Sequence, residues 1–166
     1  MSEGEVLLKV GAELPPLTIP VTRTLIVAGA IASRDYQDVH HDAELARQKG
    51  SPDIFMNILT TNGLVGRYIT DHFGPTAVLR KVAIRLGAPN YPGDTMVLTG
   101  TVTEIVDADA DADAHQGTGQ APDGGRGGRG GGGVTAQVYV VGKNGLGNHV
   151  TGTVSVTVPR AEGSPS

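Results

Sequence analysis

The strongest constraint on the fold is a stretch of helical periodicity in the middle of the chain. Apolar or amide side chains recur there at spacings of three and four, which is one face of a helix: Ile54, Ile58, Leu59, Asn62, Val65, Ile69 and Phe73. Ser51-Pro52-Asp53 is a helix-start signal and Gly74-Pro75 is a stop signal. We therefore expect a helix over residues 54–72. Leu64, Tyr68 and Met56 widen this apolar stripe. A helix with so wide an apolar face should be buried by other elements.

After this segment the period changes to two, the pattern of half-buried strands. We expect strands over residues 78–86, 95–106, 134–141 and 150–158. In the first of them one face should hold Val78, Val82, Ile84 and Leu86. Residues 88–94 and the pair Asn144-Gly145 have turn chemistry. The chain has no Trp and only 4% aromatic residues, so the core between helix and strands must be aliphatic.

Three shorter elements are predicted ahead of the long helix. Residues 1–21 contain Pro15, Pro16 and Pro20, which disfavour regular structure, so we expect an extended surface segment. Residues 22–32 are rich in β-branched and small apolar side chains, which is typical of a strand. Asp42 suits the N-cap of a short helix over residues 43–48, and Gly50 suits its C-terminal end.

Residues 107–133 interrupt the regular pattern with an Asp-Ala repeat followed by a Gly-Arg run. This stretch has no aliphatic side chain larger than Ala, so burial cannot offset the cost of ordering it. We expect a disordered insertion within a β-hairpin. A calcium loop is disfavoured because the Asp spacing lacks the Gly and the closing Glu of an EF-hand. Two Arg are also too few for a nucleic-acid-binding segment.

These elements predict the α+β class: an antiparallel sheet wrapped around one long central helix, which is the hot-dog architecture. At 166 residues a single domain is expected. We place this hot-dog domain at residues 22–159, between the extended segment 1–21 and a polar tail over residues 160–166.

Charge and cysteine content exclude several classes of function. Thirteen Lys and Arg stand against 17 Asp and Glu, a net charge of −4, whereas a nucleic-acid binder usually carries a basic stripe. The absence of Cys excludes disulfides, thiolate zinc sites and a Cys nucleophile. The acidic N-terminus has no signal-peptide pattern, and no apolar run is long enough to span a bilayer. We expect a soluble cytoplasmic protein that binds neither nucleic acid nor membrane.

Residues 34–42 are the stretch richest in chemical groups, with three Asp and two His. A carboxylate and an imidazole held side by side can move a proton or activate a water. Asp35 and His40 are five residues apart, so they converge only across a turn or irregular loop. The alternative is a plain turn, in which the Asp caps the chain and the His satisfies a carbonyl. A metal site is disfavoured, because the adjacent His40 and His41 side chains would point apart and no third His or remote carboxylate stands out.

The same stretch resembles the motif of MaoC-like (R)-specific enoyl-CoA hydratases: Asp-x-Asn-Pro-Leu-His, a second Asp, and later His-Gly-Leu at the helix start. Here the sequence reads Asp35-Tyr36-Gln37-Asp38-Val39-His40, then Asp42, then Asn57-Ile58-Leu59. The acid, the imidazole and their spacing are kept. The chain departs from the family pattern at Gln37, Asp38, Asn57 and Ile58.

A narrower likeness extends over most of residues 20–158, leaving out the Asp/Gly insertion. It is to the catalytic small subunits of heteromeric hydratases in bacterial cholesterol side-chain degradation. The residues that carry it are those of 34–42 and 53–60, together with Gly63-Leu64-Val65, Arg67-Tyr68, Thr70-Asp71, Arg85-Leu86-Gly87 and Val141-Gly142-Lys143-Asn144.

The resemblance implies hydration of the 2,3 double bond of a bulky, steroid-type enoyl-CoA thioester, without a cofactor. Asp35 and His40 would form the general acid–base dyad. The backbone N–H of Ile58, at the start of the long helix, would receive the negative charge on the thioester oxygen, with Asn57 beside it as a substrate-binding residue. A second MaoC-like hot-dog subunit would complete the pocket in a heterodimer or heterotetramer. Basic candidates for the CoA phosphates are Arg47, Lys49, Arg80, Lys81 and Arg85.

Two other functions stay open. A hot-dog acyl-CoA thioesterase would usually use a carboxylate from the long helix, where the expected buried face offers Asn57 and Asn62 but no acid. A non-catalytic hot-dog subunit would only bind and stabilise a partner, and it would not need the pair of Asp35 and His40.

Overall fold

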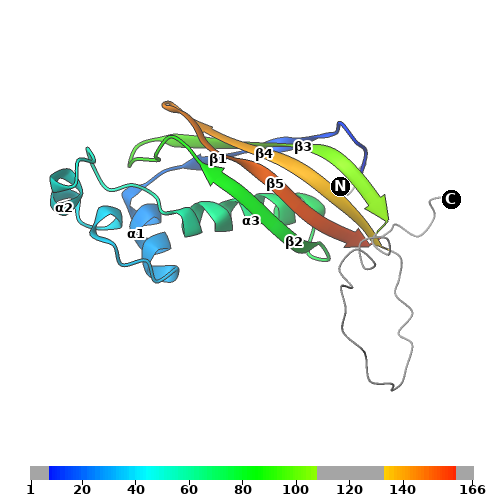
Figure 1. Ribbon diagram of the computed structural model, residues 1–166, viewed down its shortest axis with the longest axis horizontal. Helices are drawn as coiled ribbons and strands as arrows, with labels where there is room; N and C mark the ends of the chain where they lie inside the picture. Colours follow the sequence, from blue (N-terminus) through cyan, green and yellow to red (C-terminus); the bar gives the residue numbers. More distant parts are fainter. Residues whose placement is uncertain (1–7, 108–132, 160–166) are drawn as a thin grey trace, which may run out of the picture.

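The computed structural model describes residues 8–107 and 133–159 (Figure 1). Five antiparallel strands form one sheet in the order β1-β3-β4-β5-β2. These strands are β1 (Glu13–Pro20), β2 (Val78–Leu86), β3 (Thr95–Asp107), β4 (Gly133–Asn144) and β5 (Gly147–Pro159). The helices are α1 (Arg23–Ala32), α2 (Ala43–Gln48) and α3 (Ile58–Phe73), and a 3₁₀ turn, η1 (Asp38–His40), lies between α1 and α2.

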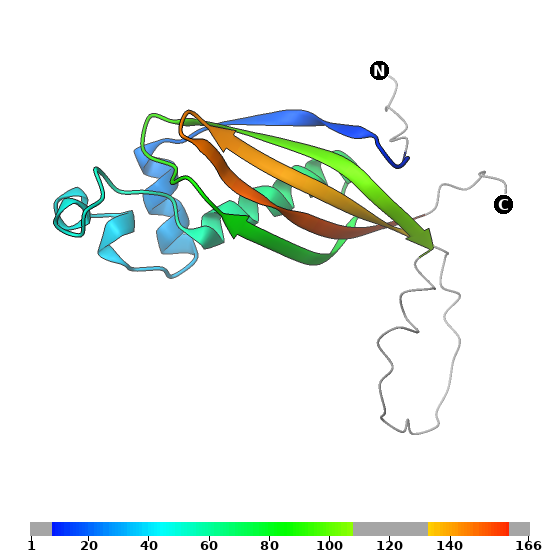
Figure 2. The same ribbon diagram turned by 45° about the horizontal axis from the view of Figure 1, so that its top comes forward.

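The long helix α3 runs along one face of the curved sheet, as the two views show (Figures 1 and 2). Val65 and Ile69 of α3 are fully buried, and they share one aliphatic core with the strand residues Leu98, Val138 and Val154. This is the hot-dog fold, so the predicted α+β class with one long central helix is confirmed. In the described ranges, no helix has the length and apolarity needed to cross a membrane.

The helix α3 begins four residues later than the sequence pattern predicted. Asn57 is its N-cap: the backbone is extended there, and its side chain accepts a hydrogen bond from the Thr60 N–H at 2.9 Å. The predicted start at Ile54 is wrong, because Ile54 belongs to the extended lead-in. The predicted face is wrong near the helix start as well, since Ile58 and Leu59 are each 49% exposed and Asn62 is also exposed. The predicted end at Gly74 is confirmed.

The prediction of a strand over residues 22–32 is wrong, since these residues form α1. Thr22 caps the helix by accepting a hydrogen bond from the Leu25 N–H at 3.0 Å. Ile26 and Ala30, four residues apart, are its buried residues. Packing against α3 and the 3.6-residue period therefore prevail over the local preference of β-branched residues for strands.

The proline-containing segment near the N-terminus also forms regular structure, although its prolines disfavour it. Residues 13–20 form β1, which pairs with β3 at the edge of the sheet. An edge strand tolerates proline because it donates to only one neighbour, and the register shifts between Leu14 and Leu17, where Pro15 and Pro16 lie. The prediction of an irregular segment ahead of the domain is therefore wrong for these residues.

The predictions for the remaining elements agree with the structure, apart from one face of β2. The four later strands, the 88–94 turn and α2 with its Asp42 cap are all present. In β2 the register shifts between Leu79 and Lys81. This shift leaves Val78 46% exposed and not on the inner face where it was predicted. Most of the predicted insertion (residues 108–132) and the predicted tail (160–166) lie outside the described residues, so the domain limits stay predictions.

Candidate functional site

The end of α1 sets the backbone position of Asp35. The Arg34 N–H donates to the Ile31 oxygen at 3.1 Å, and the Asp35 N–H reaches back to the Ala30 oxygen at 2.9 Å. These two bonds define a Schellman turn. Arg34 occupies the left-handed position of this turn, with φ 57°, where Gly is usual. Asp35 follows directly, so the helix terminus fixes where its side chain starts.

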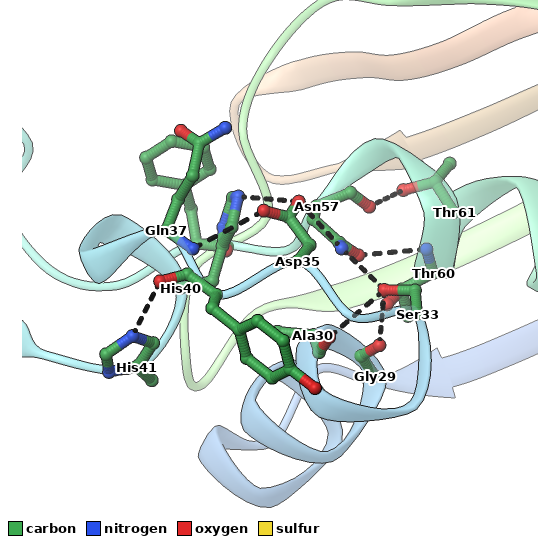
Figure 3. Close-up of polar contacts among 12 residues, drawn as sticks. Gly29, Ala30, Ser33, Asp35, Gln37, His40, His41, Asn57, Thr60 and Thr61 are labelled. Carbon is green, nitrogen blue, oxygen red and sulfur yellow. Dashed lines mark hydrogen bonds and ion pairs between the residues drawn. The ribbon is translucent and has the colours of Figure 1, made fainter.

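The turn η1 then folds the chain back so that Asp35 and His40 meet. His40 Nε2 lies 3.3 Å from Asp35 Oδ2, and the two side chains are 7% and 17% exposed. Figure 3 shows the carboxylate and the ring facing each other across this loop. The irregular loop that their spacing requires is therefore present, and it brings the two predicted residues together.

The His40 ring is held from its other side by the segment before α3. Its Nδ1 lies 2.7 Å from the Phe55 carbonyl oxygen. A carbonyl can only accept, so Nδ1 carries the hydrogen, and the neutral ring presents an unprotonated Nε2 to Asp35. The Phe55 ring packs edge-on against the imidazole, with 5.1 Å between centroids. In this neutral form a lone pair on Nε2 faces a carboxylate oxygen, and one water molecule can donate a hydrogen to each.

Asn57, the N-cap of α3, contacts the same carboxylate. Its Nδ2 donates to Asp35 Oδ2 at 3.0 Å and to Ser33 Oγ at 2.9 Å. Ser33 in turn donates to the Gly29 oxygen at 2.7 Å, at the end of α1 (Figure 3). Asn57 is only 2% exposed. The sequence motif pointed to Asn57 but not to Ser33; the only signal for Ser33 is a small polar residue just before the motif.

The predicted oxyanion donor, the Ile58 N–H, lies at the start of α3. Ile58 is the first helical residue, so no carbonyl of the helix accepts a hydrogen bond from its N–H. This N–H therefore remains available to a ligand. The positive end of the helix dipole stabilises an anion bound there. Because Asn57 immediately precedes it and contacts Asp35, this N–H and the carboxylate belong to one small region of the fold.

The other residues of the motif have structural contacts. Asp38 pairs with Lys49 at 2.8 Å, and this hydrogen bond lowers the pKa of Asp38. His41 Nε2 lies 3.2 Å from the Tyr36 oxygen. Asp42 caps α2 through the Glu44 and Leu45 N–H groups. Among residues 8–107 and 133–159, no three His, Cys, Asp or Glu side chains gather as a metal site would require.

Some of the basic residues considered for the CoA phosphates already have partners. Lys49 is bound to Asp38, Arg47 lies 3.8 Å from Glu44, and Arg80 donates to Thr157 Oγ1 at 2.9 Å. These contacts are exposed, so they would not prevent a stronger anion from binding. The assignment of a phosphate site to these residues stays a prediction.

A buried histidine that no sequence pattern singled out lies behind the start of α3. His149 on β5 is 1% exposed; its Nδ1 lies 2.7 Å from the Ala88 oxygen and its Nε2 2.8 Å from Thr61 Oγ1. Burial lowers the pKa of His149. The neutral ring satisfies both contacts, with Nδ1–H donating to Ala88 and Thr61 donating to Nε2. This pair supports the first turn of α3 from the sheet side.

Comparison with known proteins places the chain among proteins of this architecture. A family model described as a MaoC-like domain matches residues 9–120, which is more than half of the sequence. The chain belongs to the MaoC-like domain family. The chain is 43% identical over 149 residues to the 3-oxo-4,17-pregnadiene-20-carboxyl-CoA hydratase beta subunit of Mycobacterium tuberculosis (strain ATCC 25618 / H37Rv). The match covers 90% of this chain and 95% of that relative.

Two solved structures resemble this fold. A chain of the ChsH1-ChsH2 complex from Mycobacterium tuberculosis superposes with a TM-score of 0.72 at 42% identity, covering 93% of this chain and 100% of that one. The (R)-hydratase from A. caviae involved in PHA biosynthesis superposes with a TM-score of 0.70 at 16% identity, covering 92% and 98%. At that identity, the second match shows the shared fold alone.

Proposed function

We propose that this chain is the dyad-bearing subunit of an enoyl-CoA hydratase, which adds water across the 2,3 double bond of a bulky, steroid-type enoyl-CoA thioester. The observation that carries the proposal is the contact of Asp35 Oδ2 with His40 Nε2 at 3.3 Å, beside the N-terminus of α3. The Mycobacterium tuberculosis relative is named for a pregnadiene-carboxyl-CoA substrate, which supports the substrate class.

In the proposed reaction the dyad works as general acid and base. A water molecule that lies beside both side chains donates one hydrogen to Asp35 and one to His40 Nε2. As the water oxygen attacks C3, Nε2 takes its proton, and the dyad then returns a proton to C2. The Phe55 carbonyl holds the Nδ1–H throughout, so the ring stays oriented while its charge changes. Positioned proton transfer of this kind contributes roughly 10²- to 10⁴-fold to a rate.

Attack at C3 places negative charge on the thioester oxygen, which then resembles an enolate. The Ile58 N–H and the positive end of α3 receive this charge. This donor is a backbone group, so it is present with Ile58 as it would be with the family's Gly. The Ile58 side chain does reshape the pocket around it. The thioester therefore lies over the N-terminus of α3, with its double bond toward Asp35 and His40.

A second MaoC-like hot-dog subunit completes the pocket in this proposal. Large apolar side chains that follow Asp35 and Asn57 in sequence are exposed: Tyr36 by 66%, and Ile58 and Leu59 by 49% each. Exposed apolar groups gathered at one place are typical of an interaction site. The 42% identical chain belongs to the ChsH1-ChsH2 complex, which supports a heteromeric arrangement. The acyl group then lies between the two subunits, which makes the active species a heterodimer or heterotetramer.

The test is a hydration assay on the chain co-purified with a second MaoC-like subunit, followed as loss of the enoyl absorbance of a steroid-type enoyl-CoA. We expect Asp35→Asn and His40→Asn each to lower kcat by at least about 100-fold, since each removes one member of the dyad. Asn at position 40 can still donate to the Phe55 oxygen, so the loop should stay folded.

Asp38→Asn and His41→Asn are the matched controls, because they change the same residue types in the same loop outside the dyad. Both should keep activity near that of the unmodified protein, and all four variants should keep its circular dichroism spectrum. Full hydration activity in either dyad variant would refute the proposed roles.

The same assay distinguishes hydration from thioester hydrolysis. The buried residues of α3 are Thr61, Val65, Gly66, Tyr68 and Ile69, so this face carries no carboxylate for a thioesterase. We expect loss of the enoyl absorbance without release of free CoA thiol. Thiol release at the rate of substrate loss would favour the thioesterase, and activity of the complex that is insensitive to Asp35 and His40 would favour a non-catalytic subunit.

A further inference from the structure

We propose that Asn57 is a positioning residue, which fixes the orientation of the Asp35 carboxylate so that Oδ2 faces His40. This inference rests on the proposed function, because it concerns the same dyad. It differs from the role that the family resemblance implies for Asn57, in which the residue binds substrate directly. The contacts of Asn57 carry the distinction.

Every amide hydrogen of Asn57 has a partner inside the protein. One Nδ2–H donates to Asp35 Oδ2 at 3.0 Å, and the other donates to Ser33 Oγ at 2.9 Å. Its Oδ1 accepts from the Thr60 N–H at 2.9 Å. The residue is 2% exposed. Asn57 therefore has no donor left for a thioester oxygen, which leaves that role to the Ile58 N–H.

The neighbours of Asn57 allow only one orientation of its amide. The Thr60 N–H can only donate, so the atom it contacts must be the oxygen. The other terminal atom of the amide is then the nitrogen, which donates to the Asp35 carboxylate. Ser33 uses its own hydrogen on the Gly29 oxygen, so its Oγ accepts from Asn57. A flipped amide would lose all three bonds.

These bonds join two segments that carry different halves of the dyad. Asp35 follows the end of α1, whereas the Phe55 carbonyl that orients His40 lies just before α3. Asn57 lies at the start of α3 and reaches Asp35 across this junction (Figure 3). Its bond to the carboxylate therefore holds the acid at a fixed position relative to the imidazole.

Asn57→Asp is the most direct test, because it keeps the size and the helix cap of the side chain but replaces the donor with an acceptor. Two carboxylates would then face each other, and Asp35 would turn away. We expect kcat of the complex to fall by about 10- to 100-fold, the scale of a misplaced catalytic group, with KM changed less than about threefold. Asn57→Ser also keeps a helix cap but lacks the amide donor to Asp35, so its kcat should fall by a similar factor.

Asn62→Asp provides the matched control, since Asn62 lies on the same helix and is exposed. It should leave kcat and KM unchanged. A double variant separates positioning from a structural role. Because Asn57 acts through Asp35, adding Asn57→Asp to Asp35→Asn should lower activity no further. A further fall of tenfold or more would overturn the inference.

Two more outcomes of the Asn57→Asp measurement would overturn it. Unchanged kcat would show that the carboxylate does not depend on Asn57. A raised KM at unchanged kcat would show that Asn57 binds substrate. Neither outcome affects the proposed function, which fails only if the Asp35→Asn and His40→Asn variants stay active or the unmodified complex does not hydrate enoyl-CoA.

Discussion

Arg34 shows how backbone conformation at one residue prepares the site. It adopts φ 57° in the turn that ends α1, and it is the only non-Gly residue with positive φ in the described ranges. An L-residue in the left-handed region costs about 1–2 kcal/mol relative to a right-handed conformation. Asp35 is the next residue, so its position depends on a turn that has a cost in conformational free energy.

Replacing Arg34 with Gly should therefore not destabilise the protein. Gly removes the left-handed strain of about 1–2 kcal/mol but loses about 0.4–1 kcal/mol through the entropy of the unfolded chain. The free energy of unfolding should rise by about 0–1.6 kcal/mol, whereas Arg34→Val should lower it because a β-branched residue is least tolerated there. Urea denaturation of both variants tests this, and a clear loss of stability in Arg34→Gly would contradict it.

At the scale of elements, α1 and α3 approach each other closely at Gly29. A Cβ atom on Gly29 would lie 2.8 Å from Thr60 Cγ2 and 3.0 Å from Thr60 Cβ, distances that real side chains avoid. Thr60 Oγ1 is buried without a hydrogen-bond partner in the described part of the chain. The methyl and hydroxyl of Thr60 thus fill the space above Gly29 by contact alone, and this contact sets the spacing of the two helices that carry the site.

Gly29→Ala should destabilise the protein, and Thr60→Ala should rescue part of the loss. Overpacking costs about 1–3 kcal/mol, against a gain of up to about 1 kcal/mol in helix propensity, so the net effect is destabilising. Removing the hydroxyl and methyl of Thr60 relieves most of the clash and breaks no hydrogen bond. Urea denaturation of both single variants and the double variant gives the coupling energy, and additive effects would contradict this account.

His149 couples β5 to the first turn of α3 and should make stability depend on pH. Burial lowers its pKa below the ordinary value of 6.5. The unfolded chain therefore binds a proton as pH falls through 6.5, whereas the native state does not. The stability contributed by the neutral ring is present above pH 6.5 and is lost as pH falls toward the native pKa.

Thermal melting at pH values from 7.5 to 5.5 tests this linkage. The melting temperature should fall with pH in the unmodified protein and fall less in His149→Asn, which can keep a donor to the Ala88 oxygen. His41→Asn, at an exposed histidine, should keep the slope of the unmodified protein. An equal slope in His149→Asn would show that this residue is not the source.

At the scale of the whole molecule, the surface that a partner would cover in the proposed function lies at the α3 N-terminus. Leu59 is 49% exposed there, while Val78, 46% exposed, begins β2 at the far end of the sheet (Figure 1). If a second hot-dog subunit covers the dyad, Leu59→Ser should weaken co-purification with it and Val78→Ser should not. Neither change should alter the melting temperature of the chain by itself, since both side chains are half exposed. Equal recovery of partner by Leu59→Ser and the unmodified chain would contradict this placement.

The hot-dog class was predictable because its main signals are local. The helical period through Val65 and Ile69 and the period-two strands after residue 77 each report a buried face directly. The Asp42 cap and the Gly74 stop are local as well. The two elements that were assigned the wrong structure are Arg23–Ala32 and Glu13–Pro20, where packing on α3 and pairing at the sheet edge prevailed over β-branched and proline preferences.

By itself, then, the sequence determined the fold class, the long helix and the acid and imidazole of the candidate site. Only the tertiary structure decided how they meet. The 3.3 Å contact of Asp35 with His40 depends on the end of α1, the turn η1 and the Phe55 carbonyl, which come from separate stretches of chain. The contact between Asn57 and Asp35 spans 22 residues. Periodicity carries no information on such pairs, because they form only when the helices pack on the sheet.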